Sequence, residues 1–428
     1  RDLHYPLRRL RQMCIRDRRC CYTKIMQSLP PLPEWVKLEH KVAQILTQQE
    51  IHGWFFDESS ARELESALRT EYEAITEVLR KRFPYVAGAE FTPKRNNGKQ
   101  GYIEGCTFTR LKEFNPVSRD HISWILQIHC GWTPELLTST GKAVIDETVL
   151  REIGTDIALK FLTLLDLTKQ LGMISEGVNA WQKLCTKSRI HHYCATNTAT
   201  FRCHHRTPNL GQVPSDERFR RLFTATPGQR MVAADLSGIE LRMLAHYLAR
   251  YDGGRYAKIL TTGDIHQTNA DKIGITRRQV KTVTYAFLYG CGDIKLGHSY
   301  DQLLSEESAR QKGKEIRKAY VAAIPGLAEL LQACKKCSDR GYANAIDGRR
   351  ISVDKGHKFL NYLLQGSAAS IAKRWMVTIN ECLPSDAHQL SFVHDELNYE
   401  CYPKDAKELA KWLELAATFA GEHYNLRC

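Results

Sequence analysis

Residues 276–290 read TRRQVKTVTYAFLYG, and the interpretation of the whole chain begins from this stretch. The pattern predicts a helix. At 3.6 residues per turn, positions four apart drift by only about 40°, so such positions share a face. Four residues have this spacing. Arg277 and Lys281 are cations, and Tyr285 and Tyr289 are aromatic. Cations at one end and rings at the other suit a nucleoside triphosphate, whose phosphates would meet the cations.

The same helix has a plainer interpretation. Tyr285 and Tyr289 could pack in a core while Arg277 and Lys281 face solvent, because one-sided helices usually bury their apolar face. Gly290 is expected to end the helix in either case.

Upstream, MVAADLSGIELRMLAHYL (231–248) begins as a predicted short buried strand, 231–234, and then turns helical. Asp235 lies at the exit of that strand. Its carboxylate and the carbonyl of Leu236 are hard oxygen ligands of the kind that Mg²⁺ prefers. The alternative is a helix start, in which Asp235 or Ser237 caps the helix and Ser237 forms a capping box with Glu240.

Downstream, the runs QLSFV and LNYEC are predicted strands separated by a turn at His394, Asp395 and Glu396. Aspartate is common in turns for local reasons, so the turn alone is weak evidence. Apolar residues on both sides suggest that the turn is held against a core. Two carboxylates on adjacent strands could then hold a pair of metal ions about 3.5–4 Å apart.

Taken in order, three of these segments resemble motifs A, B and C of the family A (polymerase I-like) DNA polymerases. The segments are DLSGIELR (235–242), RRQVKTVTYAFLYG (277–290) and VHDE (393–396). Further similar stretches are TATFRCHHRTPNLGQVP (198–214), GDIH (263–266), DGRR (347–350) and NYLLQGSAASIAKRW (361–375). The resemblance extends over about residues 35–428. It is nearest to the replicative polymerases of short-tailed bacteriophages, because Gly238 and Tyr285 replace a Gln and a Phe usual in bacterial repair enzymes.

The resemblance implies an α+β chain with the right-hand polymerase fold, made of an antiparallel palm sheet, a helical thumb and helical fingers. The expected division is an unassigned basic segment that is imported or incomplete (1–34), N-terminal helices and thumb (35–185), first palm part (186–250), fingers (251–340) and second palm part (341–428).

The resemblance also implies template-directed addition of dNTPs to a primer 3′-hydroxyl with release of pyrophosphate, in phage DNA replication. Asp235, Leu236 and Asp395 would bind two Mg²⁺ ions, with Mn²⁺ as a substitute, and Glu396 would support the site. The primer hydroxyl would attack the α-phosphate in line. Lys281 is the expected general acid for the leaving pyrophosphate.

Further roles follow from the same resemblance. Arg277, Lys281 and His266 would grip the triphosphate. Glu240, with Tyr285, would exclude a ribose 2′-hydroxyl, and Tyr289 would stack beside the templating base. Five residues are expected to contact DNA: Arg202, Asn361, Gln365, His394 and Arg349. The family usually has Gly before Arg202, whereas this chain has Phe201, which puts the geometry of that loop in question.

Charge and length add several expectations. The net charge of +13 favours a polyanionic partner, although residues 1–24 alone supply eight Lys or Arg against two Asp. No apolar run suits a membrane span, so the cytoplasm, that of an infected host, is expected. We expect a monomer. The basic region 83–115 is predicted to be an exposed loop or small flap, and its shortness makes binding of a thioredoxin-type processivity factor doubtful.

No segment resembles a 3′-5′ exonuclease, so proofreading is not expected. Two other functions fit less well. A single-subunit phage RNA polymerase shares part of the motif pattern, but Glu240 and the HDE triplet at 394–396 favour DNA. An inactive DNA-binding remnant of a polymerase would not need the full set of carboxylates and cations that this chain keeps.

Overall fold

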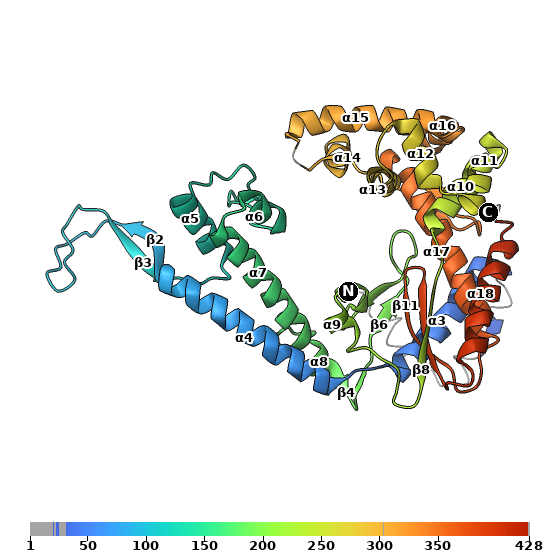
Figure 1. Cartoon of the computed structure of the whole chain (residues 1–428), viewed down its shortest axis with the longest axis horizontal. Helices are drawn as coiled ribbons and strands as arrows, with labels where there is room; N and C mark the ends of the chain where they lie inside the picture. Colours follow the sequence, from blue (N-terminus) through green and yellow to red (C-terminus); the bar gives the residue numbers. More distant parts are fainter. Residues whose placement is uncertain (1–19, 21–22, 25–30, 303, 427–428) are drawn as a thin grey trace. The chain divides into compact units, whose positions relative to one another are not determined.

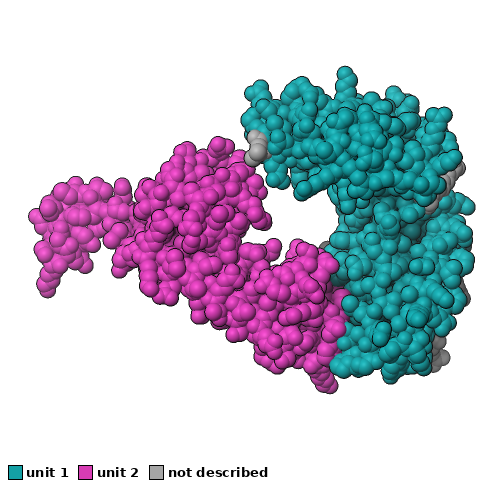
Figure 2. All heavy atoms as spheres, in the orientation of Figure 1, with its two compact units in different colours: residues 1–53, 193–206, 225–428 teal, residues 54–192, 207–224 magenta. Residues whose placement is uncertain are grey.

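The structure, a computed structural model, describes residues 20, 23–24, 31–302 and 304–426. Most of the basic segment 1–34 therefore lies outside the described residues. The chain forms two compact units, coloured in Figure 2: unit 1 holds residues 1–53, 193–206 and 225–428, and unit 2 holds residues 54–192 and 207–224.

Unit 1 contains a three-stranded antiparallel sheet in the order β11-β12-β8 (Figure 1). Its strands are β8 (Arg230–Asp235), β11 (His388–Val393) and β12 (Glu396–Cys401). The two strands predicted around 394–396 are confirmed. The prediction that the first strand is buried is wrong, because β8 pairs on one side only and its residues are exposed or half-buried. In β12, by contrast, every residue after Glu396 is buried.

Helices pack around this sheet and share its apolar core. They are α3 (Glu34–His52), α10 (Ile239–Asp252), α17 (Phe359–Asn380) and α18 (Ala406–His423). Helix α17 is buried along most of its length and is tied to α18 by the indole of Trp375, which donates to the carbonyl of Leu413 at 2.8 Å. Helix α3, expected with the thumb, belongs to unit 1, because Leu38 and Val42 lie in the same core cluster as α17.

A second group of helices in unit 1 carries the stretch 276–290. Its members are α11 (Arg255–Thr262), α12 (Ile265–Ile273), α13 (Arg277–Leu288), α14 (Asp293–Tyr300), α15 (Glu306–Ala323) and α16 (Leu327–Ser338). Helices α14 and α15 approach so closely that a Cβ on Gly297 would lie 1.9 Å from the carbonyl oxygen of Ala309. A Cβ on Gly313 would lie 1.8 Å from that of Asp293.

Unit 1 also contains two small hairpins and a short helix. One hairpin pairs β6 (Tyr193–Ala195) with β7 (His204–Arg206), and the other pairs β9 (Tyr342–Asn344) with β10 (Arg350–Ser352). The 3₁₀ helix η3 (Gly356–Lys358) leads into α17.

Unit 2 is built on two long helices, α4 (Glu58–Arg82) and α7 (Asp156–Leu171). Its other elements are β1 (Trp54–Phe55), α5 (Arg119–Cys130), α6 (Glu147–Ile153), the π-helix η1 (Gly172–Glu176), α8 (Trp181–Leu184), β4 (Cys185–Thr186), β5 (Arg189–Ile190), η2 (Leu210–Gln212) and α9 (Glu217–Arg220). The region predicted as a loop or flap is a two-stranded ribbon, β2 (Tyr85–Phe91) with β3 (Phe108–Glu113), that extends beyond the end of α4 (Figure 1). Among the described residues, no helix combines the length and apolar character of a membrane crossing.

Candidate active site

Three acidic residues meet at one end of the unit 1 sheet. Asp235 is the last residue of β8 and pairs across the sheet with Glu396, the first residue of β12. The backbone N–H of Leu236 donates to the carbonyl oxygen of Asp395 at 3.0 Å, which fixes the turn before β12 against the exit of β8. Two segments 160 positions apart in the sequence thus bring their carboxylates to one place.

Each carboxylate of this group makes ionisation of the others less favourable. Loss of hydration, followed by the charges of Asp235 and Glu240, raises the pKa of Asp395 to about 6, while Arg202 opposes the rise. Loss of hydration also raises the pKa of Asp235, with Glu396 and Glu240 adding to it. Crowded negative charge of this kind is relieved by a cation.

The donor set suits Mg²⁺ in a particular way. Among the described residues, no three His, Cys, Asp or Glu side chains gather closely enough to hold a metal ion by themselves. Protein sites for Mg²⁺ commonly supply one or two carboxylates and leave the remaining positions to water and substrate phosphates. Asp235, Asp395 and the Leu236 carbonyl would supply oxygen ligands to a site of this shared kind.

Glu240 does not form the capping box that was the alternative to a functional role. Helix α10 begins after Gly238, which has a left-handed backbone and gives no side-chain cap. Glu240 is 9% exposed and forms an ion pair with Arg202. It also accepts a hydrogen bond from the Tyr289 hydroxyl at 3.3 Å. The alternative, in which this segment is a helix start capped by Asp235 or Ser237, is therefore wrong.

Helix α13 has the predicted form. Thr276 and Gln279 build a capping box at its start, and the helix ends at Leu288, before Gly290 with its positive φ of 70°. The rings of Tyr285 and Tyr289 are stacked with centroids 6.5 Å apart. Tyr289 is 48% exposed, so the alternative that both tyrosines pack in the core is wrong.

The cationic end of α13 lies beside α12. The Nε of Arg277 donates to Asp264 at 2.7 Å, and Asp264 also caps α12 through the N–H of His266 at 3.0 Å. Loss of hydration lowers the pKa of His266, and the nearby cations Arg277 and Lys281 lower it further. The carboxylate of Asp264 opposes this fall, and a bound polyanion would likewise favour the protonated imidazole.

Four of the five residues expected to contact DNA lie beside the elements already described. Arg202 pairs with Glu240, and His394 has a left-handed backbone in the turn before Asp395. Asn361 donates to the carbonyl of Leu288 at 3.1 Å, which ties α17 to the end of α13. Gln365 follows one turn later on α17 and is half-buried.

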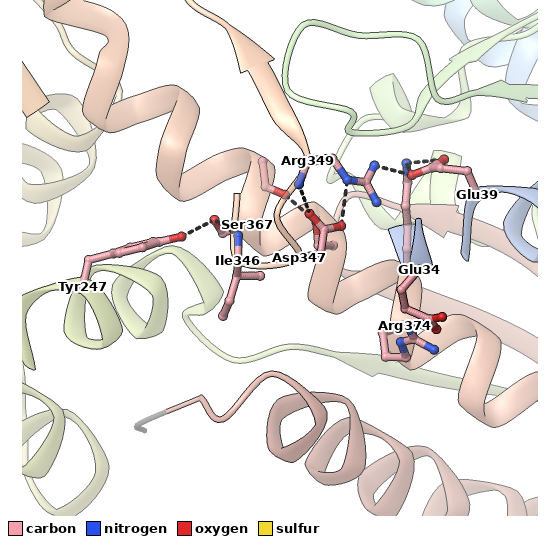
Figure 3. A network of polar contacts seen from close by, with 11 residues as sticks. Glu34, Glu39, Tyr247, Ile346, Asp347, Arg349, Ser367 and Arg374 are labelled. Atoms are coloured by element: carbon pink, nitrogen blue, oxygen red, sulfur yellow. Dashed lines mark hydrogen bonds and ion pairs between the residues drawn. The ribbon is translucent and has the colours of Figure 1, made fainter. Parts of the chain in front are cut away.

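Arg349 is placed differently from the other four residues, and its burial argues against the expected DNA contact. The side chain is 1% exposed, donates to Asp347 at 2.7 Å and is paired with Glu39 (Figure 3). A guanidinium buried between two carboxylates cannot reach a DNA backbone without breaking both pairs. The DGRR segment alone gave no sign of this, because Glu39 comes from a distant part of the chain.

Comparisons with known proteins agree with this geometry. The sequence pattern of DNA polymerase family A matches residues 95–426. The DNA-directed DNA polymerases of Enterobacteria phage T3 and Escherichia phage T7 are each 30% identical over 484 positions, covering 92% of this chain and 68% of the relative. This chain belongs to DNA polymerase family A.

Two further comparisons agree with the family and with the fold. DNA polymerase I of Rhizobium leguminosarum is 28% identical over 69% of this chain and 32% of the relative. A solved structure described as the POL domain of Pol1 from M. smegmatis, in complex with DNA primer-template and dNTP, has a TM-score of 0.72. The match covers 89% of this chain and 67% of that one, at 22% identity. The right-hand fold predicted from the motifs is confirmed.

Sequence reasoning missed two features of this polymerase site. Asp264 lies inside the quoted GDIH stretch, yet its double role as cap of α12 and partner of Arg277 was not predicted. An Asp before a helix is a recognisable N-cap signal, so the first role was readable. The ion pair of Arg202 with Glu240 joins residues 38 positions apart, and no local pattern indicates it.

The raised pKa of Asp395 gives a pH prediction. A cation binds the ionised carboxylate, so the affinity of the polymerase for Mn²⁺ should fall as the pH drops through about 6. In the metal-free protein, the stability of the fold changes with pH in the opposite direction. Because the folded pKa is raised, the protonated group favours the fold, and that contribution is lost as the pH rises through about 6.

Thermal unfolding with and without Mn²⁺, at pH values below and above 6, checks this expectation. The stabilisation by Mn²⁺ should be larger above that pH. An Asp395→Asn variant should lose the dependence. A Mn²⁺ effect of equal size on both sides of the transition would contradict the assignment.

Proposed function

We propose that this polymerase extends a DNA primer on a template with dNTPs and releases pyrophosphate. The proposal rests on one observation: Asp235 and Asp395 lie near α13, the helix that carries Tyr285. After loss of hydration, the charge of Glu240 raises the pKa of Tyr285, and the charges of Asp395 and Asp235 contribute to the same rise. Geometry agrees, because the Tyr289 hydroxyl donates to Glu240 at 3.3 Å and the ring of Tyr285 stacks on that of Tyr289.

In this proposal Asp235, Asp395 and the Leu236 carbonyl hold two Mg²⁺ ions, for which Mn²⁺ can substitute, and Glu396 supports them from the edge. The bound ions would supply activation of the primer hydroxyl and neutralisation of the developing phosphate charge. Lys281 is exposed on α13 and would deliver a proton to the leaving pyrophosphate.

The triphosphate would lie at the cationic end of α13, on Arg277, Lys281 and His266. What supports this is that the charges of Arg277 and Lys281 both lower the pKa of His266, while Asp264 opposes them. Asp264 holds Arg277 in place before any ligand arrives. Tyr289, half-exposed at the end of the helix, would stack beside the templating base.

Primer-template DNA would be held by Arg202, Asn361, Gln365 and His394. The M. smegmatis domain of similar fold, which is in complex with DNA primer-template and dNTP, supports these two ligands. Contacts of this kind position the duplex without reading its sequence, as copying of any template requires. We propose a monomer acting in phage DNA replication, in the cytoplasm of the infected host, because the relatives at 30% identity are phage polymerases.

A primer-extension assay with Mg²⁺, dNTPs and a labelled primer tests the proposal directly, and a DNA trap counts nucleotides added per binding event. Template-dependent extension is expected. Extension with NTPs in place of dNTPs would favour the RNA polymerase alternative, and binding of DNA without extension would favour an inactive remnant.

Replacement of Glu240 tests the basis of sugar selection. Glu240→Ala removes a nearly buried side chain beside Tyr289, so a ribose 2′-hydroxyl would gain space. We expect discrimination against rNTPs to fall by roughly 10²-fold, measured as the ratio of kcat/KM for dNTP and rNTP.

Arg202→Ala is the comparison variant, because it breaks the same ion pair but leaves the Glu240 side chain in place, so its loss of discrimination should be smaller. Equal loss of discrimination in both variants would mean that the ion pair, and not the bulk of Glu240, excludes the ribose.

Replacement of Tyr285 tests selection at the 3′ position. The family resemblance implies that Tyr285 lets dideoxynucleotides enter almost as well as natural ones. Tyr285→Phe is expected to lower incorporation of ddNTPs by at least about tenfold, seen as weaker chain termination at fixed ddNTP to dNTP ratio. Tyr289→Phe is the control, and unchanged termination in Tyr285→Phe would contradict the prediction.

A further inference from the structure

Phe201 has a left-handed backbone, with φ of 59°, which residues other than glycine seldom adopt. It lies in the loop between β6 and β7, directly before Arg202. Two hydrogen bonds close this turn. The N–H of Phe201 donates to the carbonyl of Thr198 at 3.0 Å, and the Thr198 hydroxyl donates to the carbonyl of Arg202 at 2.8 Å. The left-handed step therefore sets the direction in which Arg202 leaves the loop.

The ring of Phe201 rests on a fixed partner. Its centroid lies 5.0 Å from the guanidinium carbon of Arg349, and the ring of Trp35 lies 5.5 Å from the same carbon. Figure 3 shows Arg349 between Asp347 and Glu39, whose carboxylates hold it. Because Arg349 is 1% exposed and paired on two sides, it offers Phe201 a surface that does not rearrange.

The other end of the loop reaches the nucleotide side of the site. Arg202 is paired with Glu240, and Glu240 accepts the hydrogen bond from Tyr289. The side chains of Arg202 and Glu240 are 16% and 11% exposed, so a shift of the loop would displace this ion pair. A continuous series of contacts thus runs from buried Arg349 through Phe201 and Arg202 to Glu240.

We propose that Phe201 is a positioning residue for nucleotide selection: its ring, packed on Arg349, holds Arg202 in the direction in which it meets Glu240. The inference rests on the proposed function, since selection has meaning only if dNTPs are substrates. It assigns to Arg349 an indirect role in place of a DNA contact. Loss of the Phe201 ring frees Arg202, which loosens both the Glu240 pair and the hold on the primer end.

Phe201→Gly tests this, because glycine adopts the left-handed conformation without strain and only the ring is lost. The variant is assayed as the intact chain with Mg²⁺, for kcat and KM of dNTP and rNTP and for primer-template affinity by fluorescence anisotropy. We expect discrimination between dNTP and rNTP, and primer-template affinity, each to fall about tenfold, within the range for residues that act through a network.

Arg350→Ala is the matched control, since Arg350 is the exposed neighbour of Arg349 and lies over the ring of Tyr342 at 4.7 Å. It should leave discrimination and DNA affinity unchanged. A fall equal to that of Phe201→Gly would overturn the proposal.

A double-mutant cycle separates positioning from a general structural defect. If Phe201 acts through Arg202, then Phe201→Gly should change discrimination less than about twofold once Arg202→Ala is present. Fully additive losses would overturn the proposal. If Phe201→Gly does not fold, Phe201→Leu, which keeps an apolar side chain without the ring, enters the same cycle. Discrimination equal to that of the parent in whichever variant folds would also overturn it.

Failure of the proposed function would look different. A parent protein that does not extend primers would contradict the polymerase activity itself. In that case the anisotropy cycle of Phe201 and Arg202 with primer-template DNA would still decide whether the ring positions the arginine.

Discussion

Asp395→Ala is expected to lower the rate of primer extension by at least about 10³-fold, because it removes one of two carboxylates that would hold the metal ions. The fold should survive the change. The pKa of Asp395 is raised to about 6, so its ionised form is disfavoured in the folded protein at neutral pH. Its removal should therefore leave the thermal midpoint unchanged or higher, while the activity is lost.

Asp386→Ala is the control for this experiment, because Asp386 is exposed in the turn before β11 and belongs to the same unit. Single-turnover extension at saturating dNTP and Mg²⁺ should be unchanged in that variant. If Asp395→Ala retains more than about a tenth of the parent rate, Asp395 is not a catalytic residue.

Glu39→Gln is expected to destabilise the protein by about 3–5 kcal/mol, since it leaves buried Lys373 without its counter-charge and Arg349 with Asp347 alone. Glu39, on α3, accepts from Lys373 on α17 at 2.7 and 2.9 Å and is also paired with Arg349. The side chains of Lys373 and Arg349 are both 1% exposed, so water cannot replace the missing carboxylate. Burial lowers the pKa of Lys373, and Glu39 is the main group that opposes this.

A matched control exists on the same pair of helices. Lys41 on α3 pairs with Glu381, the C-cap of α17, but these side chains are 54% and 58% exposed. Glu381→Gln should therefore cost about 1 kcal/mol or less. Urea unfolding followed by tryptophan fluorescence measures both variants. Similar costs for Glu39→Gln and Glu381→Gln would mean that the Glu39 cluster is as well hydrated as a surface pair.

Local spacing predicted the elements that carry the chemistry. Helix α13 and its end at Gly290 follow from the four-residue period of Arg277 to Tyr289, and strands β11 and β12 follow from the runs on either side of Asp395. These features are local, because the residues that decide them lie within a few positions of each other. The α+β fold and the family followed from three motifs in order.

What could not be predicted depends on pairs distant in the sequence. Arg349 lies in an exposed-looking DGRR turn, and only the approach of Glu39, 310 positions away, makes it a buried ion. Strand β8 reads as buried because its residues are apolar, but burial depends on neighbours on both sides, and β8 has one. The local pattern around Glu240 matches a capping box. In the structure, Glu240 instead pairs with Arg202, which lies outside that pattern.

The glycine contacts between α14 and α15 limit how these two helices can move relative to each other. At Gly297 and Gly313 backbone meets backbone, so no layer of side chains separates the helices to slide or repack. Asp293, at the start of α14, is also bound by Arg317 of α15 at 2.7 Å, and Arg317 reaches back to the carbonyl of Cys291 at 2.6 Å. Helices α14 and α15 are therefore expected to move as one rigid pair in any rearrangement of this part of unit 1.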